Sequence, residues 1–475
     1  MAGTLTAPNF RPSITAFILL ALLSFPSCVL SIGVNYGTLA DNLPPPSQVA
    51  SFLKSKTYID RVKIFDCNPD ILRSFAGSGI SLFITAPNGD IPSLSRLPGA
   101  RAWVAANISP FYPATNISLI AVGNEIMASG DRNLIAHLVP AMRSLSAALS
   151  AAGFPQIRVS TPHSLGILSA SQPPSSGRFR RGYDRAIFAP MLDFHRRTKT
   201  PFVVNPYPYF GYTDQTLNYA LFKPNRGIYD PVTRITYTNM FDAQLDAVFS
   251  AVSRLGYGDV EIAIGETGWP TAAEPGQTGV DPAAAASYVG NVIRHVSSGK
   301  GTPRMPNRKF ETYIFALFNE DLKPGPIAER NWGLFRPDFT PVYDAGVLQA
   351  GNQGGVAAKF CVAKAGASEA ALIANINYAC SVAGVDCRPI QPGGSCFEPN
   401  LIQAHASYAM NAYYQAAGRH DFNCDFGQTG VISNSNPESM TSLRMGGGHE
   451  RRGYESSFVN AMVIASSPRE NGPDN

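Results

Sequence analysis

The sequence lacks the motifs of several large functional classes. Its 475 residues carry a formal net charge of only +4 and contain no dense run of Lys or Arg, so nothing in it indicates a nucleic-acid partner. It has no HExxH motif and no cluster of Cys and His, and we expect no metal site. No Gly-rich phosphate loop follows a predicted strand, and no GxSxG motif is present. We therefore expect no cofactor.

Long apolar runs are also missing. The apolar stretch Ile14–Phe25 is too short to cross a bilayer as a helix. It follows Arg11 and precedes Val29-Leu30-Ser31, a candidate cleavage site. Residues 1–31 are therefore predicted to be a secretory signal peptide, with an uncleaved anchor as the alternative.

The other end of the chain has no apolar terminal run either. Residues 435–475 are polar and Gly-rich, unlike a glycosylphosphatidylinositol signal, and we expect a disordered tail. We expect a secreted protein of the extracellular space or cell wall, with no membrane span. Secretion makes Asn107-Ile-Ser and Asn116-Ile-Ser candidate glycosylation sites, although Pro110 follows the first triplet.

Cysteine is scarce over most of the chain. Apart from Cys28 in the predicted signal peptide, only Cys67 precedes residue 361, and the other five lie between 361 and 424. This asymmetry predicts a large domain held by its apolar core and a small one held by disulfides. We place the large domain at 32–347, a Gly/Ala-rich linker at 348–358 and the small domain at 359–434.

Short apolar segments alternate with helix-like ones in the large domain. The stretches Asp131–Ala152 and Asn239–Gly256 have apolar residues at three- and four-residue spacing, typical of amphipathic helices. Alternation of this kind favours an α/β fold, a parallel (β/α)8 TIM barrel, with an open doubly wound sheet as the alternative. The predicted strands are Ile32–Gly37, Arg61–Asp66, Ser81–Pro87, Ile117–Glu125, Ile157–His163, Pro201–Tyr209, Val260–Trp269 and Glu311–Glu320.

Polar and aromatic residues stand at the C-terminal ends of these strands, where such barrels carry their functional groups. Aromatic rings stack on sugar rings, and amides and carboxylates bond hydroxyls, so a cleft of this composition suits a carbohydrate. His163 is expected to be structural. The strand ends are Asn35-Tyr36, Asp66, Asn88, Asn124-Glu125, His163, Asn205-Tyr207-Tyr209, Glu266-Trp269 and Phe318-Asn319-Glu320.

Two of these ends carry a glutamate in a similar setting. Glu266 lies in Ile-Gly-Glu-Thr-Gly-Trp-Pro, and Glu125 ends Ile-Ser-Leu-Ile-Ala-Val-Gly-Asn-Glu. A pair of facing carboxylates cleaves glycosidic bonds. The residues alone do not assign which glutamate takes which role.

Seven phrases along the large domain carry a resemblance to a known family. They are IGVNYG at 32–37, AVGNE at 121–125, NPYPYF at 205–210, YTNMFDAQLDA at 237–247, GETGWP at 265–270, ETYIFALFNEDLKPG at 311–325 and ERNWGLF at 329–335. In this order they resemble the plant family 17 glycoside hydrolases, the endo-β-1,3-glucanases.

The resemblance implies retaining hydrolysis, with Glu125 as general acid/base and Glu266 as nucleophile. It also implies that Asn124 bonds the sugar 2-hydroxyl, although this side chain could instead cap the following turn. The aromatic residues that match the family near the substrate could instead pack the barrel rim, and the charged cluster could be a solvated ion pair. The aromatic residues are Tyr36, Tyr207 and Trp269, and the cluster is Glu320, Lys323 and Glu329.

The small domain resembles the plant carbohydrate-binding module 43, through its cysteine spacing and the phrases IQPGGSCFEPN at 390–400 and HASYAMNAYYQ at 405–415. It departs from that family by having Phe360 before Cys361 and no sixth cysteine after Cys424. The family pairing implies the disulfides Cys361–Cys424 and Cys380–Cys387 and leaves Cys396 unpaired. We therefore expect a module that is less stable or whose cysteines are partnered differently.

The leading prediction is a monomeric enzyme that hydrolyses β-1,3-glucan of the callose or laminarin type from within the chain. A β-1,3-glucan transglycosylase uses the same covalent intermediate, and a glucan-binding wall protein of little turnover uses the barrel as a lectin. The sequence does not distinguish hydrolysis from transfer.

Overall fold

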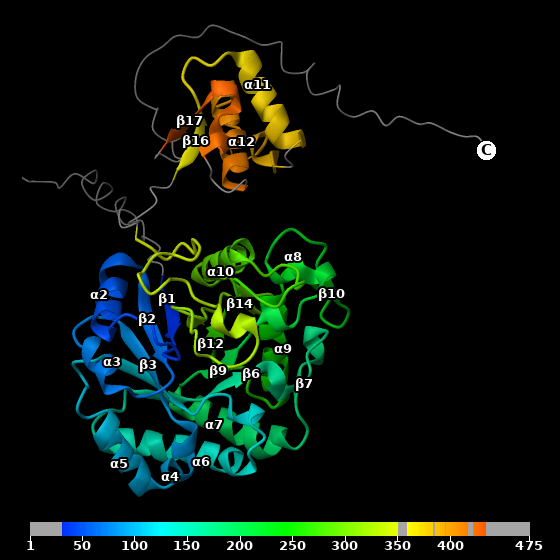
Figure 1. Ribbon diagram of the computed structural model, residues 1–475. Coiled ribbons are helices and arrows are strands. Elements are labelled where there is room, and N and C mark those ends of the chain that lie inside the picture. Colours follow the sequence, from blue (N-terminus) through cyan, green and yellow to red (C-terminus); the bar gives the residue numbers. More distant parts are fainter. Residues whose placement is uncertain (1–30, 350–358, 383–384, 395, 417–420, 434–475) are drawn as a thin grey trace, which may run out of the picture. The chain divides into compact units, whose positions relative to one another are not determined.

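The computed structural model describes residues 31–349, 359–382, 385–394, 396–416 and 421–433 (Figure 1). The predicted signal peptide apart from Ser31, the linker after Gln349 and the predicted tail lie outside the described residues. The chain divides into two units, Met1–Asn352 and Gln353–Asn475.

The first unit is built on one parallel sheet. Its order is β5-β4-β3-β2-β1-β15-β12-β9-β6. The two end strands are separated only by Thr161, and one pairs with β4 while the other pairs with β9, so the sheet closes through this segment. The TIM barrel is confirmed. The strands are β1 (Ile32–Tyr36), β2 (Ile59–Ile64), β3 (Ser81–Ala86), β4 (Ile117–Val122), β5 (Arg158–Ser160), β6 (Pro162–Ser164), β9 (Phe202–Asn205), β12 (Ile262–Thr267) and β15 (Thr312–Ile314).

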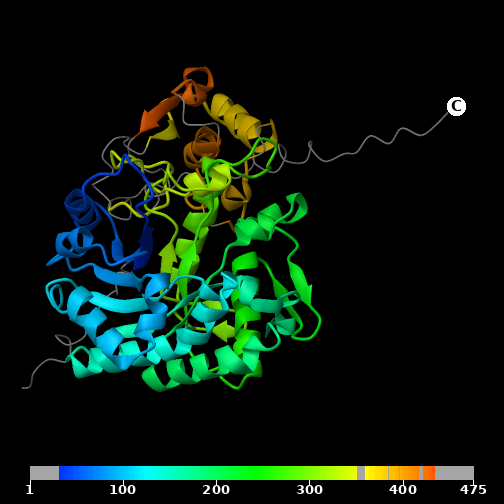
Figure 2. The ribbon, with the colours of Figure 1, turned by 60° about the horizontal axis from the view of Figure 1, so that its bottom comes forward.

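Helices follow the strands and cover the barrel (Figures 1 and 2). After β15 the described chain forms loops and a short 3₁₀ helix, η8 (Ile327–Arg330), in place of an eighth α-helix. The helices are α2 (Pro46–Lys56), α3 (Pro69–Ser74), α4 (Ile91–Leu94), α5 (Leu97–Asn107), α6 (Arg132–Ala151), α7 (Ala189–Thr198), α8 (Leu217–Ala220), α9 (Met240–Arg254) and α10 (Pro282–Ser297). Three outer hairpins are β7 (Leu168–Ala170) with β8 (Arg178–Phe179), β10 (Ile228–Asp230) with β11 (Ile235–Tyr237), and β13 (Gly301–Thr302) with β14 (Met305–Pro306).

The helix α6 shows how the sequence pattern becomes packing. Asp131 caps its N-terminus by accepting from Asn133 N and Leu134 N, and its buried face packs on α4 and α5. It is also the one helix of the described chain that is long and apolar enough to cross a membrane by length and composition. Its buried side chains pack in the barrel's outer layer, which is the pattern of a core helix.

Alternation of side chains along the strands gives the barrel two cores. One set of residues fills the barrel interior and the other packs between strands and helices, so both faces of the strands are buried. The interior set is Phe83, Leu119, Ala121, Val203, Ala263 and Tyr313.

Several strands end before the predicted limits. The strand β4 stops at Val122 because Gly123 and Glu125 both take positive φ, 67° and 52°, a region that favours glycine. Likewise β9 ends at Asn205 and β15 at Ile314. Glu125 and Tyr207 therefore stand on loops just beyond β4 and β9, whereas Glu266 is still within β12.

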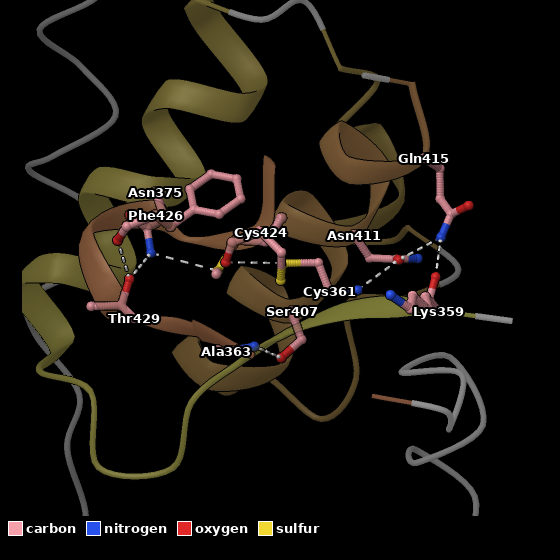
Figure 3. The surroundings of a disulfide bond; sticks show 11 residues. Lys359, Cys361, Ala363, Asn375, Ser407, Asn411, Gln415, Cys424, Phe426 and Thr429 are labelled. Carbon is pink, nitrogen blue, oxygen red and sulfur yellow. Dashed lines mark hydrogen bonds between the residues drawn. A yellow bond between two sulfur atoms is a disulfide. The ribbon is translucent and has the colours of Figure 1, made fainter. Parts of the chain in front are cut away.

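The second unit is small and contains both disulfides. Its strands β16 (Phe360–Ala363) and β17 (Gly430–Ser433) pair antiparallel, beside the helices α11 (Glu369–Asn377) and α12 (Ile402–Ala416). The bonds Cys361–Cys424 and Cys380–Cys387, implied by the resemblance, are both present, and Figure 3 shows the first of them. Cys396 belongs to neither. Cys67, in the barrel, is also a thiol, whose pKa burial raises to about 12.

Candidate active site

A cleft of about 810 Å³ opens at the C-terminal ends of the barrel strands. It contains both glutamates, together with the charged residues and aromatic rings of the loop after β15. The residues used in the argument below are Asn124, Glu125, Asn205, Tyr207, Glu266, Phe315, Glu320, Lys323, Glu329 and Trp332.

Glu266 lies on β12 and is 7% exposed. Its Oε1 accepts a hydrogen bond from Lys63 Nζ at 2.6 Å, and its Oε2 accepts one from the Tyr207 hydroxyl at 3.0 Å. Burial and proximity to Glu266 raise the pKa of Tyr207 far above its usual range, so this hydroxyl keeps its proton and donates. One donor on each oxygen fixes the carboxylate's orientation, with a positive charge against it.

The sequence analysis missed Lys63. This lysine on β2 is fully buried, and its Nζ lies 4.2 Å from the centroid of the Phe65 ring and 3.4 Å from Asn124 Oδ1. A lysine is almost never fully buried unless it is paired. Its place between Val62 and Ile64 in a predicted barrel strand was the signal that could have identified it, because a charge buried there requires a partner.

Glu125 has a different environment. It stands on the turn after β4, and its Oε1 accepts from Asn205 Nδ2 at 2.8 Å. Burial raises the pKa of this carboxyl, and the negative charge of Glu266 raises it further. The Asn205 hydrogen bond and the more distant charges of Lys63 and Lys323 only partly offset these effects. The surroundings of Glu125 therefore favour its protonated form.

Asn124 faces the cleft and contacts Lys63 through its side chain. In the described structure the short helix η2 (Ile126–Ala128) has no side-chain cap, so Asn124 does not take the capping role that was its alternative. Its backbone N–H is instead held by Asn88 Oδ1 at 2.9 Å. Asn124 is thus positioned beside both glutamates.

Two of the predicted aromatic contacts lie behind the cleft. Trp269 is fully buried and donates through Nε1 to Gly279 O at 2.9 Å. Tyr36 is 2% exposed and packs edge-on against Phe318, as in the rim-packing alternative. Neither lines the cleft. The aromatic lining comes instead from Phe65, Phe210, Phe315 and Trp332, together with Tyr207.

The charged cluster is assembled at the cleft. Lys323 Nζ lies 3.1 Å from Glu329 Oε2 and 4.4 Å from the Phe315 ring centroid. Glu320 is 6% exposed and accepts from Leu39 N at 3.0 Å. It fits only because Gly37 has no side chain, since a Cβ there would lie 2.2 Å from Glu320 Oε1. The cluster therefore sits at the cleft and is not a fully solvated loop pair.

His163 and the two glycosylation candidates do not line the cleft. His163 is fully buried, and burial lowers its pKa to about 3, so it is neutral and packs on Phe202. Of the glycosylation candidates, Asn116 is exposed, whereas the Asn107 amide donates to Trp103 O. Within the described ranges, no three His, Cys, Asp or Glu side chains are grouped to hold a metal ion.

Comparison with known proteins agrees with this architecture. The model for glycosyl hydrolases family 17 matches residues 32–347, and the X8 domain model matches residues 359–431. The chain belongs to glycosyl hydrolase family 17. We call its second unit the X8 unit.

Similar proteins cover nearly the whole chain. A glucan endo-1,3-beta-glucosidase of Triticum aestivum is 56% identical over 433 residues, covering 86% of this chain and 93% of that protein. Glucan endo-1,3-beta-glucosidase 7 of Arabidopsis thaliana is 45% identical over 440 residues, covering 90% of this chain and 87% of that protein. Among solved structures, CJP38, a beta-1,3-glucanase and allergen of Cryptomeria japonica pollen, is 41% identical with a TM-score of 0.62. It covers 66% of this chain and 98% of that one.

Proposed function

We propose that the protein hydrolyses internal β-1,3-glucosidic bonds of β-1,3-glucan with retention of configuration. The family and the relatives support the activity. The observation that carries the division of roles is the contrast between the two glutamates. Glu266 accepts a hydrogen bond from a buried lysine, while Glu125 accepts one from a neutral amide and has a raised pKa. Accordingly Glu266 is the nucleophile and Glu125 the acid/base.

In the first step, protonated Glu125 donates its proton to the glycosidic oxygen while Glu266 attacks the anomeric carbon. The aglycone leaves and a covalent glycosyl-enzyme forms. Lys63 and Tyr207 orient the attacking carboxylate before the bond forms, so little reorganisation is needed at the reacting atoms. Asn124, beside the pair, is placed to bond a hydroxyl of the bound sugar.

The second step needs Glu125 as a base. Esterification removes the negative charge of Glu266, which is one of the two causes of the raised pKa of Glu125. Glu125 then holds a proton less tightly and remains ionised after the first step. It accepts a proton from water as that water attacks the intermediate, and both carboxyls return to their starting states.

Because the substrate is a polymer, the role of the X8 unit is to hold the enzyme on glucan. We place the protein outside the cell, since its two disulfides are stable in an oxidising compartment. We expect the enzyme to act as a monomer.

The test is to incubate the full chain with laminarin and resolve the products by size. We expect shorter oligosaccharides of mixed length. Longer products would identify a transglycosylase, in which a sugar hydroxyl intercepts the intermediate. Unchanged laminarin would identify a binding protein without turnover.

A further inference from the structure

The X8 unit has a pocket of its own, which the catalytic argument does not use. Its volume is about 340 Å³, within the range of small-ligand sites. It is lined by Asn375, Tyr378, Tyr413, Asn423 and Phe426. We call these five residues the aromatic pocket.

Three rings meet edge to face in this pocket. The Tyr378 centroid lies 5.4 Å from that of Tyr413 and 6.2 Å from that of Phe426, and Tyr413 and Phe426 are 5.4 Å apart. The interplanar angles are between 73° and 80°. A hydrogen bond between the two tyrosine side chains raises the pKa of Tyr413. The rings therefore form one connected surface.

The chemistry of the pocket matches a neutral sugar. No charged side chain lines it, so it offers neither a cation for a phosphate nor a carboxylate for a metal ion. Tyr378 is 42% exposed, which leaves part of its ring open to solvent. An exposed ring provides a flat apolar surface on which a pyranose can stack.

Both disulfides hold the elements that carry the rings. Tyr378 follows α11, two residues before Cys380, which is bonded to Cys387. Phe426 follows Cys424, which is bonded to Cys361 (Figure 3). Asn375 Nδ2 donates to Thr429 Oγ1 at 2.8 Å, which ties α11 to the Phe426 turn. Tyr413 comes from α12, which packs on α11. A surface fixed in this way loses little conformational entropy when it binds.

We propose that the aromatic pocket is the glucan-binding site of the X8 unit, with Tyr378 as the ring that stacks on a glucose unit of a β-1,3-glucan chain. This rests on the proposed function, because the occupant is the polymer that the barrel cleaves. The aromatic pocket and the cleft belong to different units of the chain, and attachment of the X8 unit to insoluble polymer would keep the barrel near its substrate.

The experiment measures depletion of the full chain from solution by insoluble β-1,3-glucan, in the Glu266→Gln background so that the polymer is preserved. The variants are Tyr378→Ala and Tyr378→Leu, the second of which keeps apolar bulk without a flat ring. Leu401→Ala is the control. Leu401 is 58% exposed and precedes α12, about 18 Å along that helix from Tyr413 at 1.5 Å per residue.

We expect both Tyr378 variants to bind the polymer about tenfold more weakly and Leu401→Ala to bind like the parent. In the unmodified active-site background, Tyr378→Ala should hydrolyse soluble laminarin at the parental rate. Parental binding by Tyr378→Leu, or equal losses in Tyr378→Leu and Leu401→Ala, would overturn the proposal. Failure of the proposed function is recognised separately, as unchanged laminarin with the parent enzyme.

Discussion

The barrel and the X8 unit hold the residues of their sites in place by different means. The barrel buries two extensive apolar sets, inside and outside its strands. The X8 unit has one cluster of seven buried residues and another of three. A core that small rarely supplies enough stability by itself. The barrel can therefore bury an ion pair at its active site, whereas the X8 unit depends on covalent bonds.

This difference extends to the two sites. In the cleft, Lys63 and Tyr207 hold Glu266 through charge and hydrogen bonds in a buried setting. In the aromatic pocket, two disulfides hold the segments that carry Tyr378 and Phe426. Removing the buried charge in the barrel should therefore impair catalysis and barrel stability but not polymer binding, and removing the disulfides of the X8 unit should impair polymer binding but not catalysis.

The largest effect should come from Glu266→Gln. The change is isosteric and removes only the charge of the proposed nucleophile, so we expect the rate on laminarin to fall by at least about a thousandfold. Binding of insoluble glucan should remain close to parental. Circular dichroism checks the fold, and a variant that keeps a tenth of the activity would remove Glu266 from the nucleophile's role.

Lys63→Met should have the next largest effect. It leaves the Glu266 carboxylate buried without its cation, and we expect kcat on laminarin to fall about a hundredfold with a smaller change in KM. Breaking a buried pair by removing one partner also destabilises the fold, by about 3 kcal/mol, measured by denaturant unfolding.

Lys54→Met is the matched control for Lys63. Lys54 lies on α2 at the surface, where its Nζ contacts Gly77 O at 3.2 Å. We expect parental kinetics and stability from this variant. Equal effects of the two lysine changes would mean that Lys63 has no special role in the cleft.

Removing a disulfide of the X8 unit should have the opposite effect, which is weaker polymer binding with unchanged catalysis. Chain-entropy arithmetic assigns about 4 kcal/mol to the loop closed by Cys361–Cys424 and about 2 kcal/mol to that closed by Cys380–Cys387. Paired Cys→Ser replacement should therefore weaken capture of insoluble glucan about tenfold or more for the first bond, and less for the second. Hydrolysis of soluble laminarin should stay parental. Cys67→Ser, in the barrel, is the control, and loss of soluble activity in a disulfide variant would contradict the separation of the two sites.

The smallest change is a shift in pH dependence. The proposed mechanism requires Glu125 to be protonated, so the pKa of Glu125 should set the alkaline limb of the kcat/KM profile, above the ordinary range of a carboxyl. The Asn205 hydrogen bond favours the ionised form and lowers this pKa. Asn205→Ala should therefore raise it and move the alkaline limb to higher pH. Thr213→Ala, outside the residues that line the cleft, should leave the limb in place. A downward shift with Asn205→Ala would contradict the assignment.

The sequence predicts the barrel and its catalytic edge because both depend on local patterns. Apolar strand segments alternate with amphipathic helices such as α6, and the glycines and polar residues mark where strands end. Glu125 and Glu266 are found in this way, since each follows a buried apolar run. The roles of the two glutamates depend on the resemblance and on their surroundings.

Other features depend on contacts between distant segments. Lys63 and Glu266 are 203 residues apart in sequence, and nothing local to Ile59–Ile64 tells which residue meets its lysine. Trp269 follows Glu266 closely in the sequence, yet the backbone after β12 turns its ring away from the cleft. Closure of the barrel depends on the pairing of β5 and β6 with opposite neighbours, which no single segment carries.

The most direct test of the central claim is chemical rescue with azide on an activated aryl β-glucoside. Glu125→Ala removes the acid/base but leaves the nucleophile, so azide should attack the covalent intermediate and give the β-glycosyl azide, with retained configuration. Glu266→Ala removes the nucleophile, so azide should take its place and give the α-glycosyl azide. Proton NMR of the product distinguishes the two. An α-azide from Glu125→Ala with a β-azide from Glu266→Ala would exchange the roles of the two glutamates and contradict the account.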